Sequence, residues 1–510
     1  MKTSLLKLFF TAFLVGNMAI AMATTSNHTL SYRDDPATTI VVGWSGDDGT
    51  VYYGTTNNGQ NYMSYANNKA TDRQASVKGQ NRKFARLTGL TPNTVYYFVV
   101  HDNAGQTSQV FKFQTLSDNP NDPVSFISGG DTRQGVWPVE NCNCRTERQE
   151  GNQLVAKLRP DFVAFNGDFI RNTPLVSDDA QEWTDWFADW SLATAGDGRL
   201  TPIVMTQGNH EDGDDMYNLF DIPQDEYYAL DIHGGLIRMY SLNSELNACS
   251  DAAQLNWFDT DLQNHSGTGN DPIYKIAQYH IPTLALGNSY GLQSDQMDCW
   301  VPLFEQYGVN LVLESHTHIT KWTYPVVKNG AGTDFELDPN GIVYIGEGQW
   351  GAPHRALDFS MNPGDGNYEE WIRDQDVFDN FFFITADQNG MCIQTVRFDN
   401  VAGVATLFDD DLGSALPSGV SLWTPANTPT GCLEIAGPGA PSSIEEQASN
   451  VSQIYPVPAS DQVTVEFVKV YDQEVTIEIY NSLGKLCRTE TVSGTNQVNV
   501  DVTDLCTGVN

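Results

Sequence analysis

Residues 203–211 run Ile203-Val204-Met205-Thr206-Gln207-Gly208-Asn209-His210-Glu211, an apolar stretch followed by glycine and then by an amide, an imidazole and a carboxylate. Four other segments repeat this construction, in which an apolar strand runs into a side chain of a type that binds metal ions. The five predicted strands are Val124–Ser128, Phe162–Phe165, Ile203–Thr206, Ile273–Gln278 and Val309–Glu314, and the residues that follow them include Asp131, Asp168, Asn209, His280, His316 and His318. In open α/β sheets the ligand crevice lies at the carboxyl ends of the strands, so these side chains are expected to meet in one place.

The surrounding chain predicts a multidomain protein. At 510 residues it is long enough for three or four domains. Short β-strands separated by Gly, Asn and Asp clusters predict a β-sandwich over residues 24–117, with strands at Thr39–Trp44, Thr50–Tyr53, Thr94–Val100 and Val110–Phe113. From about residue 123, strands alternate with helices predicted at Asp179–Trp190, Ala253–Leu262 and Trp300–Tyr307. In the first of these helices, an aromatic stripe at helical spacing indicates core packing rather than a ligand site.

The order of the five motifs is more specific than any one of them. Across residues 131–318 the motifs follow in the order Asp, Gly-Asp, Gly-Asn-His-Glu, His and His-x-His. This order is similar to that of the calcineurin-like metallophosphoesterase superfamily. The stretch Leu87–Tyr97 resembles a signature of fibronectin type III-like domains and, in particular, the N-terminal domain of purple acid phosphatases. This resemblance implies a four-layer αββα-type metallophosphoesterase domain over residues 122–400.

The resemblance also implies a role for each motif residue. One metal ion would take Asp131, Asp168 and His318, and the other would take Asp168, Asn209, His280 and His316. In the family, His210 contacts the phosphoryl group and protonates the leaving oxygen after attack by a metal-bound hydroxide; a plain loop residue is the alternative. A donor set without thiolates suits zinc, manganese or iron. His316 and His318 are expected to point the same way from an extended chain.

Two arginines depart from the family pattern. Arg133 stands where other branches place a histidine ligand, and Arg171 stands where purple acid phosphatases place a tyrosine ligand. The first metal ion is therefore expected to lack its usual fourth protein ligand. Guanidinium groups pair with phosphate in a bidentate manner, so both arginines are candidate substrate contacts. The alternative is that they are arginines paired with local carboxylates.

The two ends of the chain predict export. Residues 1–23 carry Lys2 and Lys7, an apolar run and Ala21-Met22-Ala23, as in a signal peptide; a transmembrane anchor is the alternative, but the run is too short to span a bilayer. Residues 401–450 are a tail and linker. The stretches Ile454–Asp461 and Val475–Asn481, followed by Gly484, resemble the C-terminal sorting domain of the bacterial type IX secretion system over residues 451–510. This domain is expected to be truncated before its last strand, and an ordinary β-sandwich appendage is the alternative. The resemblance implies partnership with that secretion machinery and a secreted or cell-surface enzyme exported through the periplasm.

The formal net charge of −37 argues against binding to a nucleic-acid backbone, which requires clustered basic residues. The eight cysteines suit disulfides in an oxidising compartment, and Cys142 and Cys144 are expected to pair with separate partners rather than to bind a metal.

These observations predict a metal-dependent hydrolase, acid phosphatase-like, acting on small phosphate monoesters. Two alternatives stay open at this point. One is a phosphodiesterase or nucleotidase with the same site, and the other is a non-catalytic surface binding protein with a degraded first metal site.

Overall fold

The computed structural model describes residues 25–135, 142–171, 179–269, 271–286, 295–330, 334–346, 348–357, 371–398, 419–425, 432–437, 451–455, 462–467, 470, 475–480 and 486–502. The predicted signal peptide and most of the predicted linker lie outside these ranges. None of the described helices has both the length and the apolar character of a membrane span.

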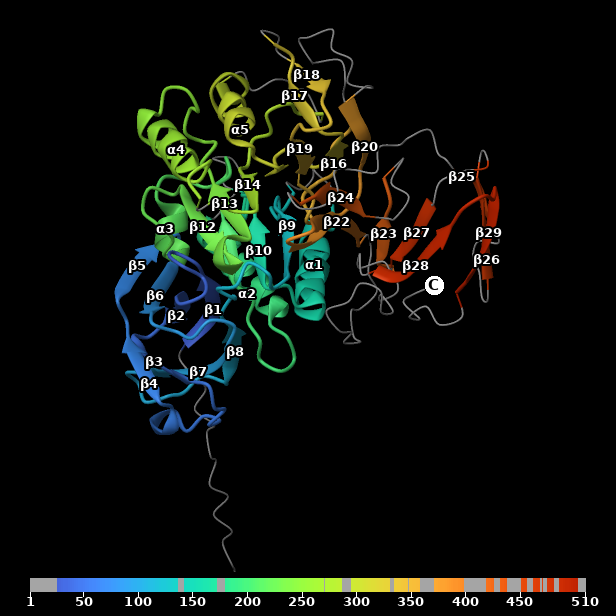
Figure 1. The fold of residues 1–510 in the computed structure, drawn as a ribbon. Coiled ribbons are helices and arrows are strands. Elements are labelled where there is room, and N and C mark those ends of the chain that lie inside the picture. Colours follow the sequence, from blue (N-terminus) through green and yellow to red (C-terminus); the bar gives the residue numbers. More distant parts are fainter. Residues whose placement is uncertain are drawn as a thin grey trace, which may run out of the picture.

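The N-terminal module is a β-sandwich, as the sequence predicts (Figure 1). One sheet has the strand order β4-β3-β7-β8, and the other contains β5-β6-β2-β1. Trp44 and Phe98 are fully buried between them. The strands are β1 (Thr25–Ser31), β2 (Ile40–Gly46), β3 (Gly49–Gly54), β4 (Asn67–Ala70), β5 (Arg73–Val77), β6 (Gln80–Leu87), β7 (Val95–Asp102) and β8 (Phe111–Gln114), with a short 3-10 turn at Tyr62–Ser64.

The sandwich is joined to the central domain through the sheet itself. β1 pairs in parallel with β11 (Ile203–Met205), where Ser31 lies opposite Ile203. The result is an 11-stranded sheet in the order β23-β22-β21-β9-β10-β11-β1-β2-β6-β5, with β24 paired to β22. Its remaining strands are β9 (Val124–Gly129), β10 (Phe162–Phe165), β21 (Asn380–Asp387), β22 (Gly390–Arg397), β23 (Ser421–Trp423) and β24 (Leu433–Ala436).

A second sheet of seven strands packs on the central part of the first, in the order β12-β13-β14-β15-β19-β16-β20. Its strands are β12 (Tyr228–Ile232), β13 (Ile237–Ser241), β14 (Tyr274–Gln278), β15 (Leu311–Leu313), β19 (Val343–Gly346), β16 (Thr320–Thr323) and β20 (Ile372–Asp376), and β17 (Val326–Lys328) with β18 (Phe335–Leu337) forms a separate ribbon. Successive side chains of a strand point to opposite faces. Accordingly, Ile276 joins the core shared with the first sheet, whereas the next residue, Ala277, joins the core under the helices.

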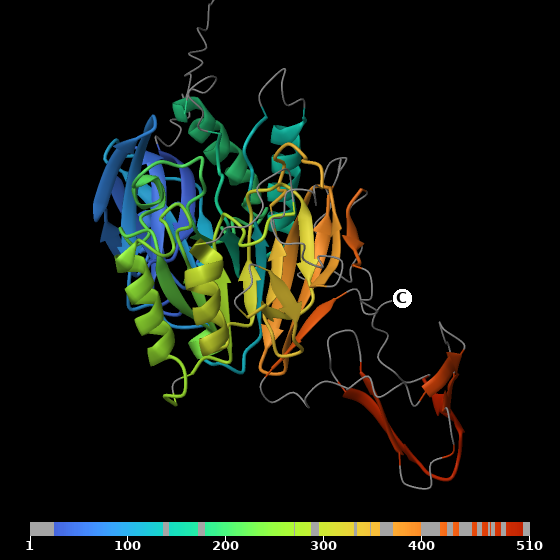
Figure 2. The ribbon, with the colours of Figure 1, turned by 90° about the horizontal axis from the view of Figure 1, so that it is seen from above.

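Helices cover the outer faces and complete four layers (Figure 2). α1 (Cys144–Leu158) and α2 (Asp179–Trp190) pack on the first sheet, and α4 (Ala252–Asn264) and α5 (Val301–Tyr307) pack on the second. α3 (Asp215–Phe220) lies beside the N-terminal module. Three shorter helical turns span Ser191–Ala193, His233–Gly235 and Gln296–Trp300. The predicted αββα architecture and the three predicted helices are confirmed; α1 was not predicted.

The described part of the C-terminal region is also built of strands. β25 (Val451–Tyr455), β26 (Gln462–Phe467) and β29 (Gln497–Asp501) form one sheet, and β27 (Val475–Tyr480) pairs with β28 (Leu486–Val492). Val465, Phe467 and Val500 form a small buried cluster. The predicted β-rich character of this region is confirmed.

The prediction that Cys142 and Cys144 pair with separate partners is wrong. The two residues form a disulfide with each other, because the turn before α1 brings their Cα atoms to 5.1 Å. Two longer-range disulfides join Cys249 to Cys299 and Cys392 to Cys432.

Candidate metal centre

The six predicted metal ligands meet at one end of the two sheets. β9, β10 and β11 are parallel neighbours in the first sheet, and β14 and β15 are parallel neighbours in the second. The ligand-bearing loops therefore converge from both sheets and not from one open sheet. Asp131, Asp168, His280, His316 and His318 are buried, whereas Asn209 is exposed. The site is thus enclosed on the protein side and open beside Asn209.

The first group consists of Asp131, Asp168 and His318, which each offer a ligand atom within 4.8 Å of the other two. His318 Nε2 lies 3.3 Å from Asp131 Oδ1. The loop of residue 348 closes over this pair, and a Cβ atom at Gly348, where φ is +78°, would lie 1.6 Å from Asp131 Oδ2. Only glycine leaves room here for the carboxylate.

The second group consists of Asp168, His280 and His316, again within 4.8 Å, so Asp168 belongs to both groups. Asn209 completes the second group, because its Oδ1 atom lies 3.0 Å from His280 Nε2 and 2.8 Å from His316 Nδ1. His280 Nε2 also lies 3.1 Å from Asp168 Oδ1. The two groups are those that the family resemblance implies.

The hydrogen bonds around the imidazoles fit metal ions. His280 Nδ1 lies 2.8 Å from the carbonyl oxygen of Asn166, and His318 Nδ1 lies 2.7 Å from that of Pro353. A carbonyl only accepts, so each Nδ1 carries the proton and each Nε2 presents a lone pair to the site. Several lone pairs then face one another in a buried space, an arrangement that a divalent cation stabilises. The donor set therefore fits divalent metal ions.

The pKa shifts agree with this interpretation. Burial lowers the pKa of His318 to about 4, against the opposing effect of Asp131, so the imidazole is neutral and able to bind a metal. Burial, and then His280, also lower the pKa of His316. Burial and the nearby Asp131 carboxylate raise the pKa of Asp168. Positive charge at the centre would favour the carboxylate form of Asp168.

The geometry of the His-x-His segment corrects the sequence-based expectation. His316 and His318 have φ angles of +81° and +56°, so the segment is not extended. The chain turns at both residues, which directs His316 to the second group and His318 to the first. Asp131 and Asp168 also have positive φ angles, of 56° and 54°. Such conformations cost energy in residues other than glycine and are concentrated at functional sites.

His210 lies at the open side of the centre. Its backbone N–H donates to Asp168 Oδ1 at 3.1 Å, and its Nε2 atom lies 3.7 Å from Asp168 Oδ2. The side chain is 15% exposed, in contrast to the fully buried His280 and His318. His210 is absent from both ligand groups, and its partly exposed ring lies beside Asp168.

Buried polar side chains hold the ligand loops. Glu211 accepts hydrogen bonds from the backbone N–H groups of Gly208, Asp168 and Phe169, at 2.8, 3.0 and 2.8 Å. On the other side, Arg148 donates to the carbonyl of Thr132 and pairs with Asp189. These contacts fix the loops after β9, β10 and β11 relative to one another. Their roles were not predicted, because most of these contacts join groups 16 to 43 residues apart in the sequence.

The two unusual arginines have different surroundings. Arg133 is buried, and its positive charge opposes the rise in the pKa of Asp168 and adds to the lowering of the pKa of His318. Arg171 is directed to Glu182 in α2: its backbone N–H donates to Glu182 Oε2 at 2.6 Å, and its charge opposes the burial that raises the pKa of Glu182 to about 7. Arg133 is therefore close to the centre, and Arg171 is close to Glu182, at the start of α2.

Arg355 is a residue of the centre that the sequence interpretation missed. Its guanidinium donates to the carbonyl of His316 at 2.8 Å, and its charge lowers the pKa of His316 and His318. The sequence signal that could have identified Arg355 is a basic residue in a loop with Gly and Pro shortly after the strand β19, Gly351-Ala352-Pro353-His354-Arg355.

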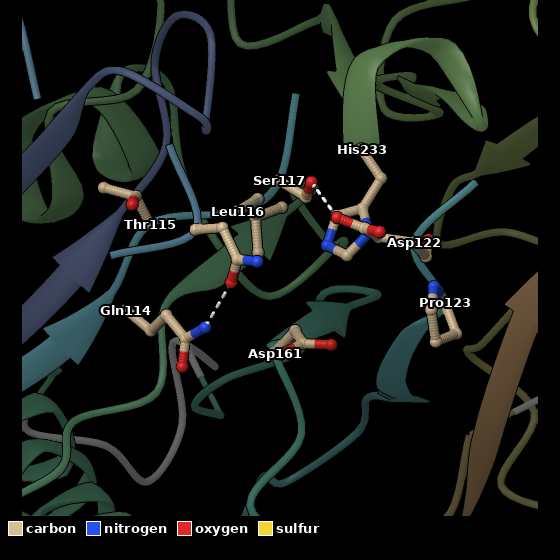
Figure 3. A pocket seen from close by; sticks show the side chains of 9 residues that line it. Gln114, Thr115, Leu116, Ser117, Asp122, Pro123, Asp161 and His233 are labelled. Carbon is tan, nitrogen blue, oxygen red and sulfur yellow. Dashed lines mark hydrogen bonds between the residues drawn. The ribbon is translucent and has the colours of Figure 1, made fainter. Parts of the chain in front are cut away.

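A separate pocket lies between the N-terminal module and the central domain (Figure 3). Its lining includes Gln114, Asp122, Asp161 and His233 and none of the predicted site residues. Ser117 and Asn119 donate hydrogen bonds to the Asp122 carboxylate. These two hydrogen bonds are local to the segment that follows the N-terminal module, and His233 Nδ1 lies 3.0 Å from the carbonyl oxygen of Asp122 in the same segment.

Three family models match the chain. They are the purple acid phosphatase N-terminal domain over residues 25–115, the calcineurin-like phosphoesterase over residues 142–320 and the secretion system C-terminal sorting domain over residues 453–509. An uncharacterized protein of Mycobacterium tuberculosis is 25% identical over 345 residues, which cover 60% of this chain and 63% of that protein. Purple acid phosphatase 15 of Arabidopsis thaliana is 23% identical over 319 residues, 55% of each chain.

Two solved structures share the fold. Purple acid phosphatase PPD1 from yellow lupin (Lupinus luteus) seeds superposes with a TM-score of 0.59 at 15% identity and covers 76% of this chain and 73% of that one. PhoD superposes with a TM-score of 0.53 at 12% identity and covers 81% and 92% of the two chains. The chain therefore consists of a purple acid phosphatase N-terminal domain, a calcineurin-like metallophosphoesterase domain and a secretion-system sorting domain.

Proposed function

We propose that the chain is a secreted or cell-surface phosphoesterase that hydrolyses small phosphate monoesters with two metal ions. One observation carries the proposal: six ligand-type residues form two groups that share Asp168, and His210 lies beside the shared carboxylate at the open side. We further propose residues 24–117, 122–400, 401–450 and 451–510 as the limits of the mature segments, with residues 1–23 removed on export.

The residues divide into three roles. Asp131, Asp168 and His318 would hold one metal ion, and Asp168, Asn209, His280 and His316 would hold the other. Two such ions polarise phosphoryl oxygens and lower the pKa of water. His210, with its 15% exposed ring, would donate a proton to the leaving oxygen. Glu211 and Arg148 keep the ligand loops in place through the backbone contacts described above.

Arg133 and Arg355 would bind and orient the phosphate. Arg355 donates to the carbonyl of His316, and the charges of both arginines add to the effect of burial in lowering the pKa of His318. They supply positive charge to a protein whose net charge of −37 otherwise repels phosphate esters. This arrangement favours a monoester, which offers more unesterified oxygens to the arginines than a diester does.

Turnover of two aryl substrates tests the proposal. The protein reconstituted with Mn²⁺ or Zn²⁺ is assayed on an aryl phosphomonoester and on the matching bis-aryl phosphodiester, with Asp168→Asn as the inactive control. We expect kcat/KM for the monoester to exceed that for the diester by about tenfold or more, as expected for one additional charged contact. A preference for the diester would identify a phosphodiesterase, and turnover of neither would identify a binding protein.

A further inference from the structure

The N-terminal module makes a set of polar contacts with the segment that carries His210. This segment, called here the His210 segment, covers residues 208–221 and includes α3. Its first residues belong to the metal centre, and its last residues lie beside β1, β5 and β6. The contacts occur at both ends of the part that follows His210.

At its C-terminal end, the His210 segment, together with the residue that follows it, receives hydrogen bonds from the module at five carbonyl groups. Arg73 donates to Tyr217 at 2.9 Å, Arg82 to Leu219 at 3.0 Å, Ser31 to Phe220 at 2.6 Å, and Arg33 to Asp221 and Ile222 at 3.2 and 2.7 Å. Arg86 holds the Asp221 carboxylate with two hydrogen bonds, of 2.7 and 2.8 Å. The last carbonyls of a helix have no partner within the helix, so the module caps α3.

The capping groups have the favourable sign of charge. The C-terminal end of a helix carries a partial negative charge, which cations stabilise. A helix of six residues has little stability of its own in water. The conformation of α3 therefore depends on the arginines of the N-terminal module.

At the other end, the module reaches the residues directly after His210. The two-residue turn Lys78-Gly79 joins β5 to β6, and both residues have positive φ angles, as a tight hairpin turn requires. Lys78 Nζ lies 3.0 Å from Asp212 Oδ2, 3.0 Å from Asp179 Oδ2 and 3.7 Å from Asp215 Oδ2. One ammonium group thus holds together three carboxylates, two of which belong to the His210 segment.

We infer that the N-terminal module positions the proton donor, with Lys78 and the capping arginines acting as positioning residues for His210. The inference rests on the proposed function and extends it to the N-terminal module, which contains none of the predicted site residues. Lys78 does not reach the metal ligands itself. Its loss leaves Asp179, Asp212 and Asp215 to repel one another two residues from His210, which loosens the donor without removing a ligand.

The test compares Lys78→Met with Lys112→Met in the full-length protein. Lys112 also belongs to the N-terminal module and also pairs with a carboxylate of the central domain, Asp197 at 2.6 Å, but it has no contact with the His210 segment. The two lysine side chains are 19% and 21% exposed, so the pair is matched in charge and burial. The measurements are hydrogen exchange of residues 208–221, bound metal, and kcat on an alkyl and an aryl phosphate.

We expect Lys78→Met to raise amide exchange in the His210 segment and to lower kcat on the alkyl phosphate about tenfold, a part of the 10²–10⁴-fold effect of a positioned acid. On the aryl phosphate, whose leaving group needs little protonation, kcat should change less than about twofold. Metal content should be unchanged, and Lys112→Met should match the wild type in all three measurements.

Two results would overturn the inference: equal behaviour of the two lysine variants, or an equal loss on both substrates in Lys78→Met. Loss of metal in Lys78→Met would also contradict it, because the effect would then not act through His210. A failure of the proposed function is distinguishable, since the wild type would then turn over neither phosphate.

Discussion

His280 Nε2 lies 3.0 Å from Asn209 Oδ1 at the middle of the second ligand group. The same imidazole uses its Nδ1 proton on the carbonyl of Asn166. An unprotonated nitrogen and an amide oxygen therefore face each other, and a cation between them removes the repulsion. The strand ends and the tautomer of one ring thus place a metal site at a defined point of the fold.

Replacement of His280 tests this site. His280→Ala should lower the affinity for the second metal ion by about 100-fold or more, because even partners outside the ligand shell contribute 10- to 100-fold. Metal content after dialysis is the measurement. His265→Ala, a histidine paired with Asp261 away from the centre, is the control and should retain both ions. Full metal retention in His280→Ala would contradict the assignment.

Replacement of His210 should separate proton donation from metal binding. We expect His210→Ala to lower kcat on an alkyl phosphate by about 10²–10⁴-fold and to have a milder effect on a nitrophenyl phosphate. Bound metal should change little, because His210 belongs to neither ligand group. His316→Ala should instead lose metal. If His210→Ala retains more than about half of the wild-type kcat on the alkyl phosphate, His210 is not the acid.

The ion pair between the buried Asp221, at the end of α3, and Arg86 predicts a stability effect. Asp221 is fully buried and accepts two hydrogen bonds from Arg86. Asp221→Asn should lower the free energy of unfolding by about 1.5–3 kcal/mol, because it removes the buried charge that accepts the two hydrogen bonds of the partly exposed Arg86. The control is Asp231→Asn, whose carboxylate is 52% exposed beside Arg238 and should cost less than about 1 kcal/mol. Urea unfolding measures both variants, and equal losses would contradict this account.

The raised pKa of Glu226 predicts that the stability of the fold depends on pH. Burial, against hydrogen bonds from Tyr217 and Met216, raises the pKa of this carboxyl to about 8 from 4.5. Between these pH values the folded state binds the proton and the unfolded state does not, so stability decreases as pH rises from about 5 to 8. Glu226→Gln should remove this dependence. The difference in the free energy of unfolding between the variant and the wild type should therefore be about 1–3 kcal/mol more favourable to the variant at pH 8 than at pH 5. Parallel stability curves for the two proteins would contradict the shifted pKa.

The strand ends and ligand types of the centre were predictable because each depends on a few neighbouring residues. β10 occupies Phe162–Phe165 and α2 occupies Asp179–Trp190, as predicted, since their patterns are local. The bends at His316 and His318 were not predictable, because tertiary contacts hold those φ angles. The helix α1 was not predictable either. Its Gly151 packs against Trp350, and a Cβ atom at this glycine would lie 2.1 Å from the indole nitrogen.

The contacts that join the domains were the least accessible from the sequence. Arg33, Arg73 and Arg86 bind groups 135 to 189 residues further along the chain. No local pattern distinguishes such arginines from exposed ones, since burial and partner are both set by the pairing of β1 with β11. Only the assembled sheet shows that the N-terminal module contacts the His210 segment.

The central claim is that two metal ions held by the six ligands are required for phosphate ester hydrolysis. The most direct measurement is a titration of chelated, metal-free protein with Mn²⁺ or Zn²⁺, in which bound metal per chain and turnover of an aryl phosphate are recorded together. The account predicts no turnover without metal and a plateau at about two bound ions per chain. Turnover that survives complete removal of metal would contradict it.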